Sequence, residues 1–421
     1  MTRKQRSSST LLCDGLDEEK IKKFVAAIEE TARYIKSIPL KRVSIVHHND
    51  TDGIASGSIL QRAFQREGFE VENIPIERIH PLILPRIHTP ERKLVLYADL
   101  GGQSIRVIEK HLQPGTSTVV LDHHPSFDST VSLLYQINPE TFGIDGDLNC
   151  SAATVVFFLA KALSDENNDL AYLGVLGAIG DHQTVNGKLT GLNQIPFSIA
   201  ESNGSIRLTG SKGGASYTFA LFDGMTGNEV SNFVTELAVN GYYQKGADFA
   251  IRACLEGPFE KARQFGFEMK KVQEDRFRKE RDRLCTQGIP SEDSLQWVDV
   301  EDRFQPLGVK AIGIFCSEIS QETWIHQDKY IVGFQDLPED NPYLGKFEWQ
   351  ETKVSMRVPP VLYQEIEKGF KPDLTKILPI AAEKAEGFAD ACHRYSAACT
   401  LPKKNKLKLI QFLREEINRI S

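Results

Sequence analysis

The sequence lacks several features that would place it in a large class of proteins. Its seven cysteines contain no Cys-x-x-Cys pair, so we expect neither a zinc ribbon nor a dense disulfide framework. No uninterrupted apolar run reaches the ~18 residues that a membrane span needs, and no apolar signal core follows MTRKQRSSST. We therefore expect a cytoplasmic protein with reduced thiols, no membrane contact and a mobile tail over residues 1–15.

The chain also lacks an excess of positive charge. Its 50 lysines and arginines face 57 aspartates and glutamates, so the formal net charge is −7. Long nucleic-acid strands usually bind to a basic surface, so this balance favours small substrates. A nucleic-acid or phosphate site in this chain must be a local patch, or must take positive charge from bound metal.

What the sequence does contain is a change of pattern along its length. Between residues 41 and 181, short runs rich in Val, Ile and Leu alternate with longer amphipathic stretches, which is typical of a parallel sheet covered by helices on both faces. The highly charged residues 255–285 predict one long exposed helix. Further on, the pattern predicts strands over residues 309–315, 329–335 and 353–358 and helices over residues 373–387 and 405–420.

These patterns predict an α/β fold in which a parallel-sheet domain is joined by a long helix to a smaller α/β domain. The expected bounds are residues 16–250 for the first domain, 251–300 for the connecting helix and linker, and 301–421 for the second domain. Residues 200–250 carry no motif that assigns them a role.

Four apolar segments of the first domain each place a carboxylate at or just past the C-terminal end. In an open parallel sheet, sites form outside the carboxyl ends of the strands, so we expect these groups to converge. The fourth segment is also compatible with a helix. The groups are Asp50 and Asp52 after RVSIVHH, Asp99 after LVLYA, Asp122 with His123 and His124 after STVVL, and Asp181 after LGVLGAIG.

Such a cluster requires compensating charge. One aspartate after a strand is usually a turn former or a helix cap, but several at contact distance repel one another and raise one another's pKa. Mixed carboxylate and imidazole ligands suit Mn²⁺, with Mg²⁺ a weaker fit because it prefers oxygen ligands. Two such ions can bridge a phosphate, activate water and stabilise a leaving oxygen.

The stretch HHNDTDG, residues 47–53, forms one corner of the expected site. Alternate side chains of an extended chain project the same way, so His48, Asp50 and Asp52 are expected to face one cavity. Gly53 would let the backbone turn sharply into a helix whose N-terminus favours an anionic substrate. His47 and His48 are both candidate metal ligands, and the alternation favours His48.

Four segments of the chain resemble, in the same order, the four motifs of the DHH phosphoesterase superfamily. They are HNDTDG, ADLGG, LDHHP and GAIGD, and the superfamily is named for the triplet at residues 122–124. The segments INPETFGIDG, NCSAAT and GDHQTVNGKLTGLN resemble most the RecJ-related exonuclease branch, particularly its archaeal-type members. The resemblance covers about residues 40–200 and implies that the first domain is a DHH catalytic domain.

The resemblance also implies roles for individual residues around two Mn²⁺ or Mg²⁺ ions. Asp99 is the expected bridging ligand, Asp122 would orient the histidines, and His124 would contact the scissile phosphate or protonate the leaving group. The implied metal ligands are His48, Asp50, Asp52, Asp99, His123 and Asp181.

The second domain resembles the DHHA1 substrate-binding domain, which carries Gly-Gly-His followed shortly by Ala-Ala-Gly. In the matching stretch ACHRYSAACTLP, residues 391–402, Ala-Cys precedes His393 and a cysteine follows the Ala-Ala pair. Glycines would let a phosphate or a base approach the backbone closely, so their loss leaves the substrate open. Upstream, Ser355 and Arg357 keep the family's Ser-x-Arg and could hold a substrate phosphate, together with His393.

Three functions follow from these features. The leading one is a Mn²⁺-dependent phosphodiesterase, a RecJ-like exonuclease that hydrolyses single-stranded DNA or RNA from an end. The second is hydrolysis of short oligonucleotides, of the nanoRNase type, or of cyclic or linear dinucleotides. The third is a replisome scaffold with little or no activity, related to accessory factors of the replicative helicase.

The acidic motifs favour an enzyme, because a scaffold does not need mutually repelling carboxylates. The altered glycines favour the scaffold. A nuclease could also have a replisome partner.

Overall fold

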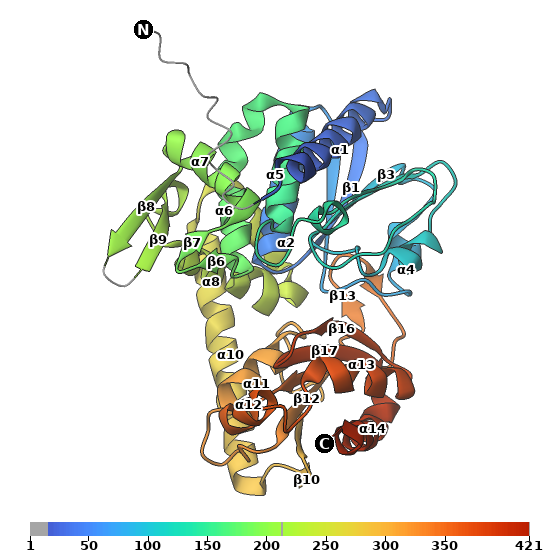
Figure 1. Ribbon diagram of the computed structural model, residues 1–421, viewed down its shortest axis with the longest axis vertical. Coiled ribbons are helices and arrows are strands. Elements are labelled where there is room, and N and C mark those ends of the chain that lie inside the picture. The colour runs from blue at the N-terminus through green and yellow to red at the C-terminus, as the bar shows by residue number, and fades with distance from the viewer. Residues whose placement is uncertain (1–15, 212–213, 421) are drawn as a thin grey trace. The chain divides into compact units, whose positions relative to one another are not determined.

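The computed structural model describes residues 16–211 and 214–420, so the predicted tail over residues 1–15 lies outside the described residues. The chain divides into two compact units (Figure 1). The first runs through Val239 and also contains Lys245–Gly266; the second contains Asn240–Gln244 and the residues from Phe267 onward. The catalytic and substrate-binding roles of the predicted domains, and their predicted bounds, stay predictions.

The first unit is built on a five-stranded sheet with the order β2-β1-β3-β4-β5. Every neighbouring pair is parallel, and β3 and β4 are buried along their whole length, as strands covered on both faces should be. The predicted α/β class with a parallel sheet is therefore confirmed. The strands are β1 (Arg42–His48), β2 (Glu70–Ile76), β3 (Leu94–Ala98), β4 (Ser117–Leu121) and β5 (Leu134–Ile137).

Helix α2 (Thr51–Arg66) is the central helix of this unit. It packs against β1 and β2 and against α5 (Ala152–Leu163), α6 (Ala171–Gly180) and α9 (Gly246–Glu256), and its first ten residues are all buried. The fourth apolar segment of the sequence, residues 173–180, thus belongs to a helix, which its composition also allowed. Other elements of the unit are α1 (Glu18–Ser37), α3 (Leu84–Ile87), α4 (Ile105–Glu109), β6 (Thr184–Val185), β7 (Lys188–Leu189), α7 (Gln194–Ser202), β8 (Ile206–Ser211), β9 (Gly214–Phe219) and α8 (Gly227–Thr235).

The second unit has a mixed six-stranded sheet with the order β10-β11-β12-β15-β17-β16, in which only β11 and β12 are parallel. Side chains of α12, α13 and α14 share a core with one face, and side chains of α10 and α11 share a core with the other. The strands are β10 (Ser291–Glu292), β11 (Leu295–Asp299), β12 (Tyr330–Asp336), β15 (Glu351–Arg357), β16 (Phe388–Cys392) and β17 (Ser396–Pro402), with a separate hairpin of β13 (Asp340–Asn341) and β14 (Gly345–Lys346). The helices are α10 (Glu260–Gln287), α11 (Ala311–Ile319), α12 (Pro360–Glu367), α13 (Leu374–Lys384) and α14 (Lys406–Ile420).

Single helical turns complete the described chain. They are 3₁₀ turns at Pro139–Phe142, Asp165–Leu170, Gly191–Asn193, Ala220–Phe222, Tyr242–Gln244 and Lys403–Asn405, and a π turn at Glu236–Asn240. Among the described helices, none is both long enough and apolar enough to cross a membrane.

One predicted strand is wrong. Residues 309–315 were expected to be extended, but α11 begins at Ala311. The buried side chains Ile312, Phe315, Cys316 and Ile319 follow the spacing of a helix face that packs against α10. A mostly apolar segment of seven residues is too short for its periodicity to distinguish a buried strand from a buried helix. The other predicted strands and helices of this half of the chain are confirmed as β12, β15, α10, α13 and α14.

Candidate metal centre

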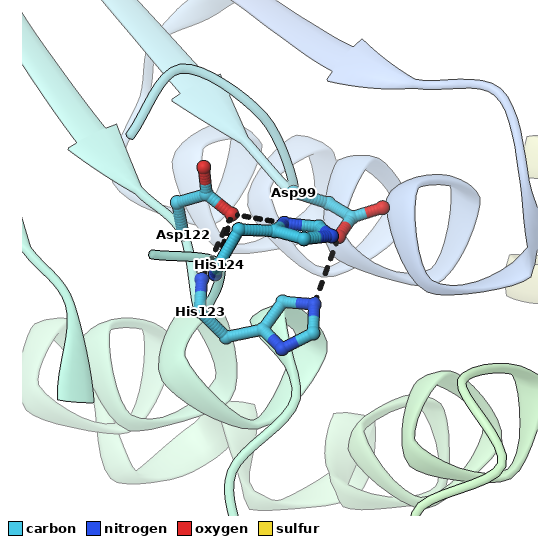
Figure 2. Close-up of side chains that lie close together, drawn as sticks. All are labelled: Asp99, Asp122, His123 and His124. Atoms are coloured by element: carbon cyan, nitrogen blue, oxygen red, sulfur yellow. Dashed lines mark hydrogen bonds and ion pairs between the residues drawn. The ribbon is translucent and has the colours of Figure 1, made fainter. Parts of the chain in front are cut away.

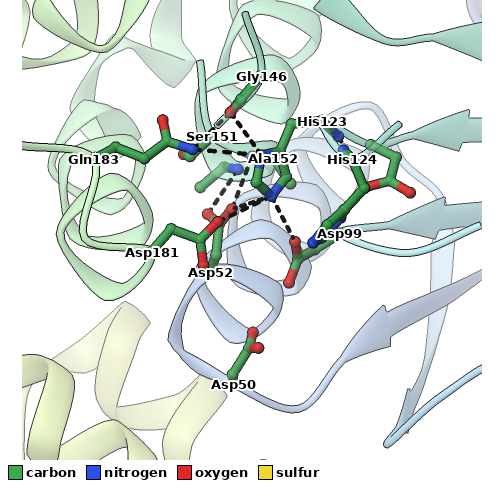
Figure 3. A network of polar contacts seen from close by, with 12 residues as sticks. Asp50, Asp52, Asp99, His123, His124, Gly146, Ser151, Ala152, Asp181 and Gln183 are labelled. Carbon is green, nitrogen blue, oxygen red and sulfur yellow. Dashed lines mark hydrogen bonds and ion pairs between the residues drawn. The ribbon is translucent and has the colours of Figure 1, made fainter. Parts of the chain in front are cut away.

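The candidate site lies at the carboxyl ends of three neighbouring parallel strands. His48 ends β1, Asp99 directly follows β3, and Asp122 directly follows β4. Three overlapping groups of side chains meet here, drawn from the ends of these strands, the beginning of α2, the DHH triplet and Asp181 after α6. In each group, the possible ligand atoms lie within 4.8 Å of one another. One group is Asp99, Asp122, His123 and His124 (Figure 2), and a second is Asp52, Asp99, His123 and Asp181 (Figure 3). The third group is His48, Asp50 and Asp99.

Asp99 belongs to all three groups, and its backbone explains how. It adopts a left-handed conformation with φ of 61°, which is uncommon for a residue with a side chain and typical of functional sites. One carboxylate oxygen, Oδ2, lies 3.3 Å from His48 Nδ1, and the other, Oδ1, lies 3.5 Å from His123 Nε2. Burial raises the pKa of Asp99, and the nearby charge of Asp50 adds to this.

The stretch HHNDTDG departs from its expected geometry. The chain is extended only as far as His48; Asp50 caps α2 by accepting a bond from Gly53 N at 3.2 Å, and Asp52 lies in the first helical turn. The alternation rule therefore does not apply to these positions. His48 Nδ1 lies 2.7 Å from Asp50 Oδ2, whereas Asp52 belongs to a different group, and Asp99 links the two.

Gly53 is needed for close approach and not for a turn. It has ordinary helical geometry, but a Cβ there would lie 2.3 Å from the carbonyl oxygen of His48.

The structure distinguishes the two candidate histidines, His47 and His48, by their surroundings. His47 is fully buried against α2, with its ring 2.6 Å from where a Cβ of Gly57 would stand, and burial lowers its pKa to about 4. His48, which the sequence favoured, is the histidine that reaches the carboxylates.

Asp52 is held by the beginning of α5. Its two carboxylate oxygens accept bonds from Ala152 N at 2.8 Å and Ala153 N at 2.9 Å, where the helix dipole favours a negative charge. Burial nevertheless raises its pKa well above the usual value, and the charges of Asp181 and Asp99 raise it further. Sequence reasoning missed these backbone donors, and the small residues of NCSAAT were the only signal of them.

The DHH triplet is internally bonded. Asp122 accepts a bond from His124 Nδ1 at 2.8 Å (Figure 2). It also accepts a bond from Gly102 N at 2.8 Å. Burial would raise the pKa of Asp122, but the charge of His124 and the bonds that it accepts hold the pKa well below its usual range. Burial likewise lowers the pKa of His124, but the charge and hydrogen bond of Asp122 outweigh it and raise the pKa to about 9. This is the contact that an orienting role for Asp122 requires.

His123 presents one nitrogen to the carboxylates. Its Nδ1 lies 2.8 Å from the carbonyl oxygen of Gly146, which can only accept, so Nδ1 carries the proton. Its Nε2 lies 2.9 Å from Asp181 Oδ2, 3.5 Å from Asp99 Oδ1 and 4.0 Å from Asp52 Oδ2. Burial lowers the pKa of His123, but the facing carboxylates of Asp181 and Asp99 raise it well above its usual value. A neutral imidazole of this tautomer is a metal ligand.

The donor set fits a divalent cation. Asp99 Oδ1 and His123 Nε2 are buried and have no hydrogen-bond partner of normal geometry in the described part of the chain. Among the described residues, no lysine or arginine pairs with Asp52, Asp99 or Asp181. Buried carboxylates without a counter-charge are costly, and a cation bound by oxygen and imidazole ligands would compensate them.

The remaining candidates lie in the second unit. Ser355 and Arg357 of β15 face α11: a Cβ at Gly313 would lie 3.0 Å from Ser355 Oγ and 2.7 Å from Arg357 Nη2. Arg357 donates from Nε to Ser317 Oγ at 2.7 Å and pairs with no carboxylate among the described residues. Burial lowers the pKa of Arg357, so an anion at its guanidinium would be favoured.

His393 is exposed in the turn between β16 and β17, where its backbone N–H donates to Ser396 O at 2.9 Å. Ser396 pairs with Arg357 in the sheet, so His393 and Arg357 lie at the same end of the sheet. The substrate-binding roles of Ser355, Arg357 and His393 stay predictions.

Comparison with known proteins gives one family match. Residues 42–178 match the model of the DHH family, N-terminal domain. Over 176 residues the chain is 30% identical to the uncharacterized protein MJ0831 of Methanocaldococcus jannaschii, and the match covers 40% of this chain and 39% of that protein. The chain therefore aligns with about two fifths of that relative's length.

Three solved structures share the fold over nearly the whole chain. A DHH domain of a member of the s1p family of ribosomal proteins gives a TM-score of 0.63 with 15% identity, covering 96% of this chain and 93% of that one. RecJ from Thermus thermophilus in complex with Mn²⁺ gives 0.57 with 16% identity, covering 96% and 56%. CDC45 from Entamoeba histolytica gives 0.56 with 10% identity, covering 95% and 99%. At these identities the likeness concerns the fold alone.

The glycines of α6 give a first prediction. A Cβ at Gly177 would lie 2.0 Å from Asp52 Oδ1 and 2.4 Å from Ala153 Cβ, so Gly177→Ala should displace the carboxylate. We expect a stability loss of about 1–3 kcal/mol in urea unfolding, as overpacking causes, and at least about tenfold weaker Mn²⁺ binding. Gly266→Ala is the control, because its nearest neighbour would lie at 3.5 Å; equal Mn²⁺ binding by Gly177→Ala would contradict the assignment.

The DHH triplet gives a second prediction. The folded-state pKa of His124 is about 9, above its ordinary 6.5, so its contribution to stability is complete below pH 6.5 and is lost as the pH rises through 9. In EDTA, the free energy of unfolding of the wild type should therefore fall over this window, and less steeply in His124→Gln. Denaturant titrations at several pH values measure both slopes, and identical slopes would contradict the His124–Asp122 pairing.

Proposed function

Because residues 42–178 belong to the DHH family as its N-terminal domain, we propose that this protein is a divalent-metal-dependent phosphodiesterase, a RecJ-like exonuclease that hydrolyses single-stranded DNA or RNA from an end. The observation that carries the proposal is the meeting of uncompensated carboxylates and histidines around Asp99. Likeness in fold to RecJ over 96% of this chain supports the same interpretation.

Two cations would be held by overlapping ligand sets. Asp99 belongs to both sets and would bridge them, which its two separately directed oxygens allow. Mn²⁺ is the better fit to mixed oxygen and imidazole donors, and Mg²⁺ is the second choice. Such ions, when bound, lower the pKa of water and stabilise negative charge on a phosphate. The proposed ligands are His48, Asp50 and Asp99 on one side and Asp52, Asp99, His123 and Asp181 on the other.

His124 would handle the proton of the reaction. Its Nδ1 is engaged by Asp122 at 2.8 Å, so its Nε2 is left to meet the substrate, and its side chain is 41% exposed. In the metal-free protein Asp122 raises the pKa of this imidazole to about 9, and a protonated imidazole can donate a hydrogen bond to a phosphate oxygen or a proton to the leaving oxygen. Asp122, with its lowered pKa, stays ionised and holds the imidazole in this orientation.

Substrate binding is assigned to the second unit. Arg357 has no carboxylate partner among the described residues, and Ser355 lies beside it on the same face of β15. A guanidinium and a hydroxyl together suit a phosphate of the strand away from the cut bond, and the exposed His393 lies at the same end of the sheet. The net charge of −7 favours short oligonucleotides or dinucleotides as the alternative substrates.

A second candidate function is a replisome scaffold with little or no activity. The likeness in fold to CDC45, which covers 99% of that chain, favours it. The uncompensated carboxylates around Asp99 favour the enzyme, because they are costly to keep together without a metal. Both functions are compatible with a protein partner.

A cleavage assay tests the proposal. The full chain is incubated with Mn²⁺ and with 5′- or 3′-labelled DNA and RNA of several lengths, beside Asp122→Asn. We expect at least a ~100-fold lower rate for Asp122→Asn, because the general acid loses its ionised partner, and a wild-type rate for Asp128→Asn, which alters an exposed carboxylate six residues away.

The products then decide the substrate. A ladder from one labelled end supports the exonuclease and gives its polarity, and cleavage confined to two- to five-mers supports the short-oligonucleotide alternative. If the wild type cleaves no substrate and equals Asp122→Asn, the enzymatic proposal is wrong and the scaffold remains.

A further inference from the structure

Two buried side-chain amides bond to the backbone that supports the candidate metal centre. Gln183 and Asn193 are 1% and 0% exposed. Gln183 Nε2 donates to the carbonyl oxygen of Gly146 at 2.8 Å, and Gln183 Oε1 accepts from Asn193 Nδ2 at 2.8 Å. The Gly146 oxygen is the same atom that accepts from His123 Nδ1 (Figure 3). One carbonyl therefore joins the amides to a proposed metal ligand.

The donor and the acceptor of each hydrogen bond in this network can be assigned. Asn193 Oδ1 lies 3.0 Å from Ser151 N, a group that can only donate, so the other end of the amide, Nδ2, must face Gln183. Gln183 must then accept with Oε1 and donate with Nε2 to Gly146. Because Gln183 Nε2 and His123 Nδ1 both donate to this oxygen, the 3.4 Å between them is not a hydrogen bond.

On the Asn193 side, the hydrogen-bond network reaches a second proposed metal ligand, Asp52. Asn193 Oδ1 also accepts from Thr154 Oγ1 at 2.7 Å, and Ser151 caps α5 by accepting from Thr154 N at 3.3 Å. Ala152 and Ala153 directly follow Ser151, and their backbone N–H groups are the ones that bond to Asp52. The amides thus link the imidazole of His123 to the helix terminus that holds Asp52.

We propose that Gln183 and Asn193 are positioning residues that hold His123 and Asp52 in the arrangement that binds one of the two metal ions. This inference rests on the proposed function, because it requires a metal at the His123 group. Gln183 fixes the Gly146 carbonyl and with it the ring of His123, while Asn193 sets the orientation of the Gln183 amide and anchors the first turn of α5. Partners behind metal ligands typically contribute about 10–100-fold to metal affinity.

Binding of Mn²⁺ alone to the full chain tests this. In Gln183→Glu an oxygen replaces the donor that faces Gly146 O, and in Asn193→Asp the donor to Gln183 is lost. Each variant should bind one Mn²⁺ ion about 10–100-fold more weakly, measured by the electron paramagnetic resonance signal of free Mn²⁺, while the other ion binds as in the wild type. His48→Ala should weaken the other ion, so the selectivity separates positioning from general destabilisation.

Asn167→Asp is the matched control. Asn167 is equally buried in the same unit, and its Nδ2 donates to Ala160 O at 2.7 Å, near the other end of α5. We expect it to lose stability in EDTA, as measured by thermal unfolding, yet to bind both Mn²⁺ ions within about twofold of the wild type.

The outcomes separate the two proposals. Wild-type Mn²⁺ binding by folded Gln183→Glu and Asn193→Asp would overturn the positioning role while leaving the metal centre standing. Equal weakening by Asn167→Asp would also overturn it, since any buried defect would then have the same effect. A wild type that binds no Mn²⁺ would overturn the proposed function itself.

Discussion

The structure depends on one electrostatic constraint: carboxylates that are buried together without a basic partner. Asp52 and Asp99 are almost completely buried and Asp181 lies beside them. Among the described residues, the only ionisable basic side chains that pair with them are histidines. Burial raises the pKa of both Asp52 and Asp99, because a charge is poorly stabilised away from water. A divalent cation would relieve this repulsion, and the same cation would supply the charge that the proposed hydrolysis of a phosphodiester needs. Under the proposed function, stability and chemistry therefore share one cause at this site.

The rest of the first unit keeps these groups in place with backbone atoms. The amides at the start of α5 hold Asp52, the Gly102 amide holds Asp122, and the Gly146 carbonyl holds His123. Backbone groups on packed elements cannot rotate away, so they fix ligand geometry more firmly than flexible side chains would. Glycine occurs where these elements come closest, since a side chain at Gly146 would meet the His123 carbonyl and one at Gly177 would meet Asp52.

Much of this site could be predicted from the sequence, because parallel strands end at a common edge, and β1, β3 and β4 each end in or directly before a carboxylate or a histidine. The preference for His48 over His47 also agrees with the geometry, although the alternation behind it does not hold past the end of β1. The contacts of Asp52 with α5 and of Gln183 with Asn193 could not be predicted, since they join segments that meet only in the folded chain. The strand predicted at residues 309–315 failed for a related reason, because the packing of α11 against α10 decides its conformation.

The central claim is that Asp99 is shared by two metal ions. Calorimetric titration of Mn²⁺ into the metal-free full chain, and into Asp99→Asn, tests it most directly, because this carboxylate belongs to both proposed ligand sets. The account predicts two Mn²⁺ ions per chain in the wild type and, in Asp99→Asn, at least about tenfold weaker binding of both ions with the fold retained. Two ions bound by Asp99→Asn with wild-type affinity, or none bound by the wild type, would contradict it.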